Sequence, residues 1–285
     1  MSSIRWAFNF RTWCPTQAEW LFCNQCIQNE ERERIHRFMF KKDAKAALIG
    51  RLLLRKAVAD LTPIPYQSIL LGRTDKGKPY LLNELDTEYK DLSFNVSHQG
   101  EYAVIAAEVD HMVGVDVMGY EKKKSTDEFF HTMRRQFTDQ EWKTIRSKQL
   151  EYDQLKMFYR YWCLKESYIK AIGIGIGFEV SRLNFLIQSD FQHDTVVMDT
   201  KLHVDDAMAT DWRFEEHELN EHCIAVAAKV YKDPNLKEDH KGTPFSVLSY
   251  QELIKNATPL CDIPTDCHYW QQFSAKPETP ADMKR

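Results

Sequence analysis

The sequence predicts an α/β protein built from two similar halves. Segment 103–109, AVIAAEV, is echoed at 224–230 as IAVAAKV, and both have the apolar composition of buried strands. A long stretch of helical periodicity precedes each segment, at 42–61 and at 155–172. Two strands can resemble each other by coincidence, but the shared order of elements favours a duplication. A site is then expected in the cleft between the halves.

The composition narrows the class of protein. Hydrophobic residues make up 43% of the 285 residues, which argues against a disordered chain. The net charge of -4 gives no reason to expect binding to nucleic acids or membranes. The N-terminus lacks a signal-peptide pattern, and no apolar run is long enough to span a bilayer. Seven widely spaced cysteines indicate reduced thiols. We therefore expect a soluble intracellular protein.

The elements expected in the N-terminal half follow from periodicity and turn residues. They are a strand at 4–10, helices at 16–28 and 42–61, a turn at 72–79, and strands at 92–98 and 101–109. Basic residues outnumber acidic ones between 32 and 56. A solvated helix face explains such a run, and an anionic small molecule is the sharper alternative. The turn at 72–79 can likewise bind an anion through its backbone amides or simply join two strands.

The C-terminal half has clearer signals. Thr138 and Glu141 form a capping-box pattern at the start of a helix, and the helix at 155–172 is expected to end at Gly173. Residues 173–177, GIGIG, follow a helix where a dinucleotide fingerprint follows a strand, so a Rossmann site is excluded. Strands are expected at 182–187, 201–204, 212–215 and 223–230. A polar stretch at 232–244 resembles a linker.

Two acids in apolar surroundings indicate the chemistry. Asp116 interrupts the strand-like run 113–117, VGVDV, and Glu166 lies four residues before Lys170, on the same helix face. A buried carboxylate needs a positively charged partner. A structural salt bridge would satisfy each acid separately, whereas one divalent cation bound between them would satisfy both. Magnesium suits such a pair of acids, because proteins often hold it by one or two carboxylates together with the phosphates of a substrate. Ser97 and His98 can contact such a phosphate, although a lone histidine is more often structural.

The two motifs together resemble a known family. Val113-Gly114-Val115-Asp116, followed by Trp162-x-x-Lys165-Glu166-Ser167-x-x-Lys170, is similar to the paired signature of the Sfp-type 4′-phosphopantetheinyl transferases. The resemblance runs from about 4 to 230 and takes in 73–79 and 95–100. It implies a pseudo-twofold pair of α/β subdomains, 1–111 and 112–231, with the active site in the cleft between them and 232–285 as linker and C-terminal extension.

The resemblance also implies the reaction and its participants. Coenzyme A is the co-substrate and Mg²⁺ the cofactor, and the 4′-phosphopantetheine group passes to a serine of an apo carrier-protein domain. Adenosine 3′,5′-bisphosphate is released. The implied carriers are acyl or peptidyl carrier domains, such as those of fatty acid synthase and aminoadipate-semialdehyde dehydrogenase. A cytosolic monomer that binds neither nucleic acid nor membrane is expected.

Site residues carry over by position. Glu166, Lys170 and His98 are the implied catalytic residues, and Asp116 and Glu166 hold the metal. The implied coenzyme-binding residues are Arg34, Arg73, Thr74, Asp75, Lys76, Gly77, Lys78, Asn95, Val96, Ser97, His98, Asp116, Glu166, Ser167, Tyr168, Ile169 and Lys170.

One position departs from the family pattern. Where bacterial members often have a second acid, this chain has Met118, so we expect Gln99 or water as the third metal ligand. Either Glu166 or a metal-bound water then deprotonates the carrier serine. A coenzyme A or nucleotide binding protein without chemistry remains a second hypothesis, which would require neither Glu166 nor Lys170. A metal phosphohydrolase is a third, and it should show more clustered Asp and His ligands.

Overall fold

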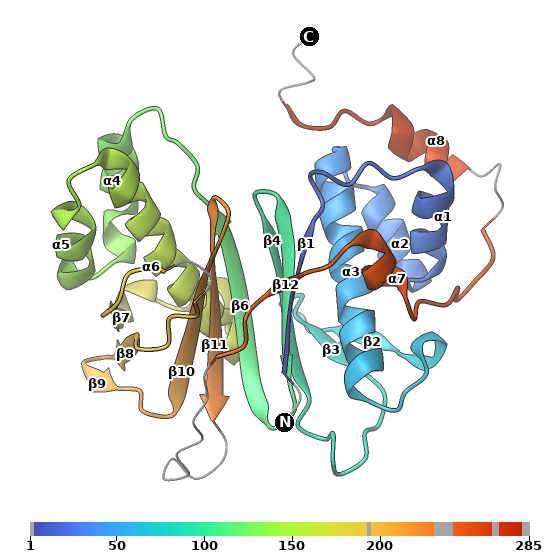
Figure 1. Cartoon of the computed structure of the whole chain (residues 1–285), viewed down its shortest axis with the longest axis horizontal. Helices are drawn as coiled ribbons and strands as arrows, with labels where there is room; N and C mark the ends of the chain where they lie inside the picture. Colours follow the sequence, from blue (N-terminus) through green and yellow to red (C-terminus); the bar gives the residue numbers. More distant parts are fainter. Residues whose placement is uncertain (1–2, 193–194, 231–241, 264–267, 281–285) are drawn as a thin grey trace.

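A computed structural model describes residues 3–192, 195–230, 242–263 and 268–280. It shows two sheets next to each other in the middle of the molecule, with the large helices on their outer sides (Figure 1). The N-terminal sheet has the strand order β12-β1-β5-β4, and the C-terminal sheet has the order β10-β11-β6. The strands are β1 (Ser3–Asn9), β4 (Ser93–Gln99), β5 (Tyr102–Glu108), β6 (His111–Gly119), β10 (Trp212–Leu219), β11 (His222–Val230) and β12 (Ser246–Val247).

The internal duplication predicted from the sequence is visible in the topology. Strands β1, β5 and β4 form an antiparallel unit with β5 in its centre, and β6, β11 and β10 repeat that arrangement with β11 in the centre. The echoed segments 103–109 and 224–230 fall on these two central strands. In each half, helices connect the first strand to a hairpin that returns beside it. The predicted α/β fold class with two similar subdomains is confirmed, whereas the boundary at 111/112 stays a prediction.

The two long helices lie where the periodicity placed them. They are α3 (Lys41–Leu61) and α6 (Glu151–Ile172), the second beginning earlier than the expected residue 155. Gly173 ends α6 with a φ of 71°, and the Thr138 capping box is formed. The other helices are α1 (Gln17–Gln25), α2 (Asn29–His36), α4 (Thr126–Met133), α5 (Asp139–Ser147), α7 (Tyr250–Ile254) and α8 (His268–Ala275). None of the helices in the described ranges has the length and apolar character needed to cross a membrane.

Two smaller sheets complete the fold. The expected turn at 72–79 is a hairpin of β2 (Leu71–Arg73) and β3 (Pro79–Leu81), in which the amides of Thr74 and Gly77 bond within the turn. In the C-terminal half, β7 (Leu183–Leu186), β8 (Lys201–Val204) and β9 (Ala207–Met208) form a sheet of their own. The strands expected at 182–187 and 201–204 are thus present, but outside the main sheet.

Side-chain alternation distributes the strands over three hydrophobic clusters. One cluster lies between the sheets and includes Val104, Val115 and Val226, while the other two lie under the helices of each half. Because Val113, Val115 and Val117 face the opposite sheet, Gly114 and Asp116 face the other way, towards α6. The alternation of β6 therefore determines which residues reach the site.

The edge strands of the two sheets meet through side chains. Ser93, Asn95 and Gln99 of β4 accept hydrogen bonds from the backbone amides of Val113, Val115 and Gly119 of β6, at 3.1, 2.9 and 2.5 Å. The paired positions increase together along both strands, so β4 and β6 run in the same direction. This seam, defined by these side-chain bonds between β4 and β6, takes the place of a backbone ladder.

The C-terminal extension returns to the N-terminal half. Strand β12 pairs parallel with β1, α7 packs on α3, and α8 packs on α1 and α2 (Figure 1). Most of the predicted linker, 232–241, lies outside the described residues. Segments 242–263 and 268–280 of the extension are consequently part of the N-terminal core, to which Leu253 and Phe273 contribute buried side chains.

Candidate active site between the two halves

Helix α6 approaches strand β6 closely at Gly114. A Cβ atom placed on Gly114 would lie 2.8 Å from the Cα of Ala171 and would overlap the carbonyl oxygen of Ser167. Only a residue without a side chain allows two backbones to come this near. The contact brings the last turns of α6 directly over β6, where Asp116 lies two residues further along the strand.

Asp116 and Lys170 form the centre of the site. The ammonium nitrogen of Lys170 lies 2.6 Å from Oδ1 of Asp116 and donates at 2.8 Å to the Ser97 hydroxyl, which in turn donates to the same Oδ1 at 2.8 Å. The Asp116 side chain is 6% exposed and that of Lys170 is 30% exposed. The three residues come from β4, β6 and α6, so both halves contribute to the cluster.

Glu166 adds a second carboxylate one helical turn before Lys170. Burial and the nearby negative charge of Asp116 raise the pKa of Glu166, and the positive charge of Lys170 opposes them in part. Within the described residues, no hydrogen bond or ion pair reaches this carboxylate. The Oδ2 atom of Asp116 is likewise buried without a partner. The site thus holds two carboxylate groups with unused acceptor oxygens.

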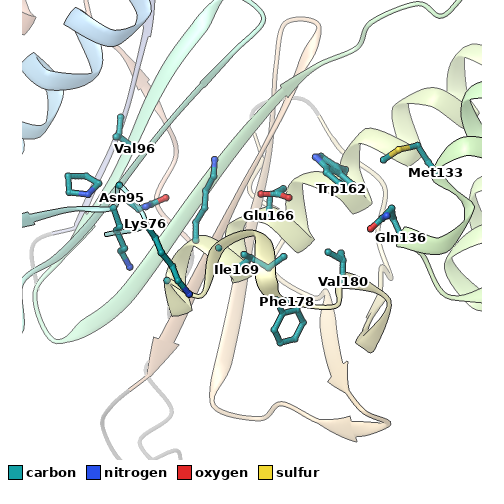
Figure 2. A pocket seen from close by; sticks show the side chains of 16 residues that line it. Lys76, Asn95, Val96, Met133, Gln136, Trp162, Glu166, Ile169, Phe178 and Val180 are labelled. Atoms are coloured by element: carbon teal, nitrogen blue, oxygen red, sulfur yellow. The ribbon is translucent and has the colours of Figure 1, made fainter. Parts of the chain in front are cut away.

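A cavity of about 730 Å³ opens beside these residues, with walls from both halves. Figure 2 shows Glu166 in its middle, Lys76 and Asn95 on one side, and Trp162 and Met133 on the other. One end is therefore basic and the other largely apolar. The further lining residues are Gly77, Lys78, Pro79, Val96, Gln136, Ile169, Lys170, Gly173, Gly175, Phe178 and Val180.

The β2–β3 hairpin of the N-terminal half reaches across to α6. Lys78 donates to the carbonyl oxygen of Ala171 at 2.9 Å, and Lys76 donates to that of Ile174. Both lysines therefore interact with the negative end of the α6 dipole. Loss of hydration lowers the pKa of Lys78. These two side chains form the basic wall of the cavity.

A second basic cluster is organised by Glu31 of α2. Arg73 binds its carboxylate with Nε at 2.6 Å and Nη2 at 2.9 Å, and the Nε atoms of Arg34 and Arg51 lie 3.4 Å from it. Burial acts to raise the pKa of Glu31, but the three guanidinium groups outweigh it and the pKa is lowered. The Glu31 cluster holds three cations in a fixed arrangement, and its excess positive charge suits an anionic ligand.

His98 and Gln99 lie at the end of β4. Partial loss of hydration and the positive charges of Lys170, Arg34 and Arg51 lower the pKa of His98, and the negative charge of Asp43 opposes them, so a neutral imidazole is favoured. The Gln99 amide nitrogen donates to Glu121 at 2.8 Å, and its oxygen accepts from Gly119 in the seam. The role of Gln99 as a metal ligand stays a prediction.

Four of the predicted residues are placed away from the reacting centre. Ser167 is buried and donates to the carbonyl oxygen of Leu164 within its own helix, and the Tyr168 ring packs against Trp212. Thr74 accepts from the amide of Lys78 in the hairpin turn, and Asp75 is exposed there. Their predicted contacts with a coenzyme stay predictions, and the side chains of Ser167, Tyr168 and Thr74 already have a structural role.

The residues fit a divalent cation with few protein ligands. The buried, unpartnered Oδ2 of Asp116 and the free Glu166 carboxylate are hard oxygen donors, and the raised pKa of Glu166 indicates that a nearby positive charge would stabilise the pair. The described residues contain no group of three Asp, Glu, His or Cys side chains able to hold a metal. A ligand would therefore have to supply further oxygens.

Sequence reasoning did not identify Glu31, Arg51 or the apolar wall of the cavity. Glu31 is one acid in a charged run, and two of its three partners, Arg51 and Arg73, come from α3 and β2, which the sequence does not place next to α2. Trp162 belongs to the quoted motif, but nothing in the pattern distinguishes its cavity-facing side chain from a core residue. Met133 lies before the Thr138 capping box, in a stretch with no motif that would mark it as a site residue.

Comparisons with known proteins identify the family. A model of the 4′-phosphopantetheinyl transferase N-terminal region matches residues 11–110, and a model of the 4′-phosphopantetheinyl transferase superfamily matches residues 112–227. A Xenopus laevis protein named L-aminoadipate-semialdehyde dehydrogenase-phosphopantetheinyl transferase is 46% identical over 100% of this chain and 96% of its own length. The chain belongs to the phosphopantetheinyl transferase family.

Similar proteins are found in organisms other than Xenopus laevis. A human protein of the same name is 44% identical over 98% of this chain and 94% of its own length. A phosphopantetheinyl transferase from Thraustochytrium is 38% identical over 79% of this chain and 77% of its own length. The resemblance seen in the two motifs is thereby confirmed, and it extends over both halves.

Proposed function

We propose that this phosphopantetheinyl transferase moves the 4′-phosphopantetheine group of coenzyme A to a serine of apo carrier domains, including those of fatty acid synthase and aminoadipate-semialdehyde dehydrogenase. The observation that carries the proposal is the Asp116–Lys170–Ser97 cluster, with the unpaired Glu166 beside it, in a cavity formed by both halves. The names of the relatives support aminoadipate-semialdehyde dehydrogenase as one of these substrates.

The reaction breaks one bond of the coenzyme A diphosphate. The carrier serine oxygen forms a bond to the phosphorus that bears the pantetheine arm, and the bond from that phosphorus to the bridging oxygen breaks. Adenosine 3′,5′-bisphosphate leaves with the electron pair, and the serine proton passes to Glu166. Glu166 is positioned as the base because its carboxylate has no hydrogen-bond partner among the described residues, and Lys170 stabilises the charge that develops on the phosphate oxygens.

The basic groups place the coenzyme. We assign the adenine nucleotide and its 3′-phosphate to Arg34 and Arg73 of the Glu31 cluster, and the diphosphate to Lys76, Lys78 and the exposed His98. Asn95 and Val96 line the cavity where the arm would pass, and Ile169 contributes to its apolar side. Positioning of this kind supplies a large part of the rate in phosphoryl transfer.

Magnesium, held by Asp116 and Glu166 with Gln99 as the candidate third ligand, would neutralise the diphosphate when bound. We further propose a monomer that acts in the cytosol. The described cysteines are free, as expected in a reducing compartment.

The decisive experiment mixes the protein with coenzyme A, Mg²⁺ and an apo acyl carrier protein, and then weighs the carrier. We expect a mass increase of one phosphopantetheine group. No increase on several unrelated apo carriers would overturn the proposal. Omission of Mg²⁺, with a chelator present, tests the metal in the same assay.

Glu166→Gln separates a transferase from a protein that only binds coenzyme A. The variant should lose transfer, because an amide cannot accept the serine proton, while isothermal titration still detects coenzyme A binding. Glu151→Gln, an exposed position in the first turn of the same helix, is the matched control. Full transfer by Glu166→Gln would remove Glu166 from its proposed role.

A further inference from the structure

The side chain of Lys276, which follows α8, caps the backbone at the end of α2. Its ammonium group donates to the carbonyl oxygens of His36 and Phe38, at 3.1 and 2.6 Å. The last carbonyl groups of a helix have no partners within the helix, and a cation there also interacts favourably with the helix dipole. Lys276 therefore supplies, from the C-terminal extension, a hydrogen-bond donor to carbonyl groups at the end of α2 and just beyond it.

Helix α2 depends on such external contacts. It is 8 residues long, has no side-chain hydrogen bond at its N-cap, and contains Ile35 as its single buried hydrophobic residue. Isolated helices of this length are unstable in water. The extension also contacts α2 through Tyr269. The Tyr269 hydroxyl donates to the Glu33 carboxylate at 2.9 Å, and the centre of its ring lies 3.9 Å from the centre of the His36 ring.

The turn that Lys276 binds contains Phe38, whose ring packs against the guanidinium group of Arg34. The guanidinium carbon of Arg34 lies 5.7 Å from the centre of the Phe38 ring, on one side, and its Nε lies 3.4 Å from Glu31, on the other. The Arg34 side chain is 46% exposed, so it is available to a ligand. Phe38 and Glu31 thus contact Arg34 from two sides, and the backbone of Phe38 is held by Lys276 together with the hydrogen bond from the Phe38 amide to the carbonyl oxygen of Ile35.

We propose that Lys276 is a positioning residue for the nucleotide end of the coenzyme site. By fixing the turn after α2, it holds the Phe38 ring under Arg34 and so orients that guanidinium group towards the 3′-phosphate of coenzyme A. The inference rests on the proposed function, and it assigns a role in substrate binding to the C-terminal extension. Lys276 itself does not contact the coenzyme.

The test compares coenzyme A with 3′-dephospho-coenzyme A as substrates of the full chain. Lys276→Met should raise the KM for coenzyme A roughly tenfold, the effect of one weakened charge-assisted hydrogen bond, and leave kcat unchanged. The KM for the dephospho form should change little, so the variant loses the preference for the 3′-phosphate. Lys276→Arg, which keeps the cation, should restore it. Lys255→Met, exposed in the same extension, is the control.

A purely structural role gives a different result. If Lys276→Met raises both KM values equally, or lowers kcat alone, the inference is wrong. Calorimetric titration with adenosine 3′,5′-bisphosphate provides a readout without turnover, and unchanged affinity in the variant also overturns the inference. Absence of transfer by the wild-type chain would instead overturn the proposed function.

Phe38→Leu keeps the experiment informative if Lys276→Met unfolds. This variant removes the ring under Arg34 and leaves the Lys276 bonds to the backbone intact. It should reproduce the selective loss of preference for the 3′-phosphate. An unchanged preference would contradict the proposed path from Lys276 to Arg34.

Discussion

Gly114 and Ala171 are in direct backbone contact. A Cβ on the glycine would stand 2.8 Å from the Cα of Ala171, and this close approach lets Lys170 reach Asp116. The glycine of the first motif and the lysine of the second therefore depend on each other. The paired signature describes a packing requirement as well as a set of reacting groups.

Gly114→Ala should impair both stability and transfer. The added methyl group forces α6 away from β6, at a cost of about 1–3 kcal/mol in the free energy of unfolding. Displacement of Lys170 by about 1 Å should lower kcat by roughly a hundredfold. Urea unfolding and the carrier-mass assay measure the two effects. Gly177→Ala has no atoms within 4 Å of the new methyl group and should behave as wild type.

Lys170→Met should abolish most of the transfer while the protein stays folded. The variant removes the cation from the phosphate and leaves Asp116 without its 2.6 Å partner, so a loss of about 10²–10³ in kcat is expected. Lys170→Arg should recover a part of it. Lys143→Met, exposed on α5, serves as the control, and an active Lys170→Met would refute the assigned role.

Glu31→Gln should weaken coenzyme binding and the fold together. Without the carboxylate, the guanidinium groups of Arg34, Arg51 and Arg73 repel one another, and several charge-assisted hydrogen bonds are lost. We expect a destabilisation of about 2 kcal/mol and a higher KM for coenzyme A. Thermal unfolding with and without adenosine 3′,5′-bisphosphate measures both. A lower KM would show that Glu31 opposes the ligand and does not organise its site.

The stability should fall as the pH is lowered, in part because of His217. Burial lowers the pKa of this β10 residue to about 4. Between the ordinary value of about 6.5 and that pKa, the unfolded chain binds a proton that the folded chain does not, so stability falls as the pH decreases through this window. The full effect is roughly 3 kcal/mol.

Urea unfolding at about pH 7.5 and about pH 5 checks this dependence. His217→Leu, which cannot be protonated, should reduce the difference in unfolding free energy between the two pH values. His131→Gln removes an exposed histidine and should leave the difference unchanged. An equal pH dependence in His217→Leu and wild type would assign the effect to other groups.

Periodicity predicted the parts of the fold that depend on burial. Helices α3 and α6 and the central strands β5 and β11 have regular apolar patterns, and all four lie where expected. Helix α2 was not predicted, because the segment NEERERIH has almost no apolar residues and is stabilised by the distant C-terminal extension. Such support cannot be recognised from the local sequence.

The site residues also fall into those that the local sequence pattern identified and those that it did not. Asp116, Glu166 and Lys170 were found because each is a polar residue in an apolar pattern, and the structure brings them together. The Glu31 cluster was only suggested by a general excess of basic residues, since its four members come from three separate elements. Their pairing depends on tertiary packing, which no spacing in the sequence records.

The side-chain seam between β4 and β6 bears on whether the halves can exist apart. In the intact chain, the side chains of Ser93, Asn95 and Gln99 accept hydrogen bonds from backbone amides of β6, the facing edge strand. Half of the molecule, expressed alone, would expose that edge and the valine-rich face of β6 to other chains, the usual start of β-aggregation.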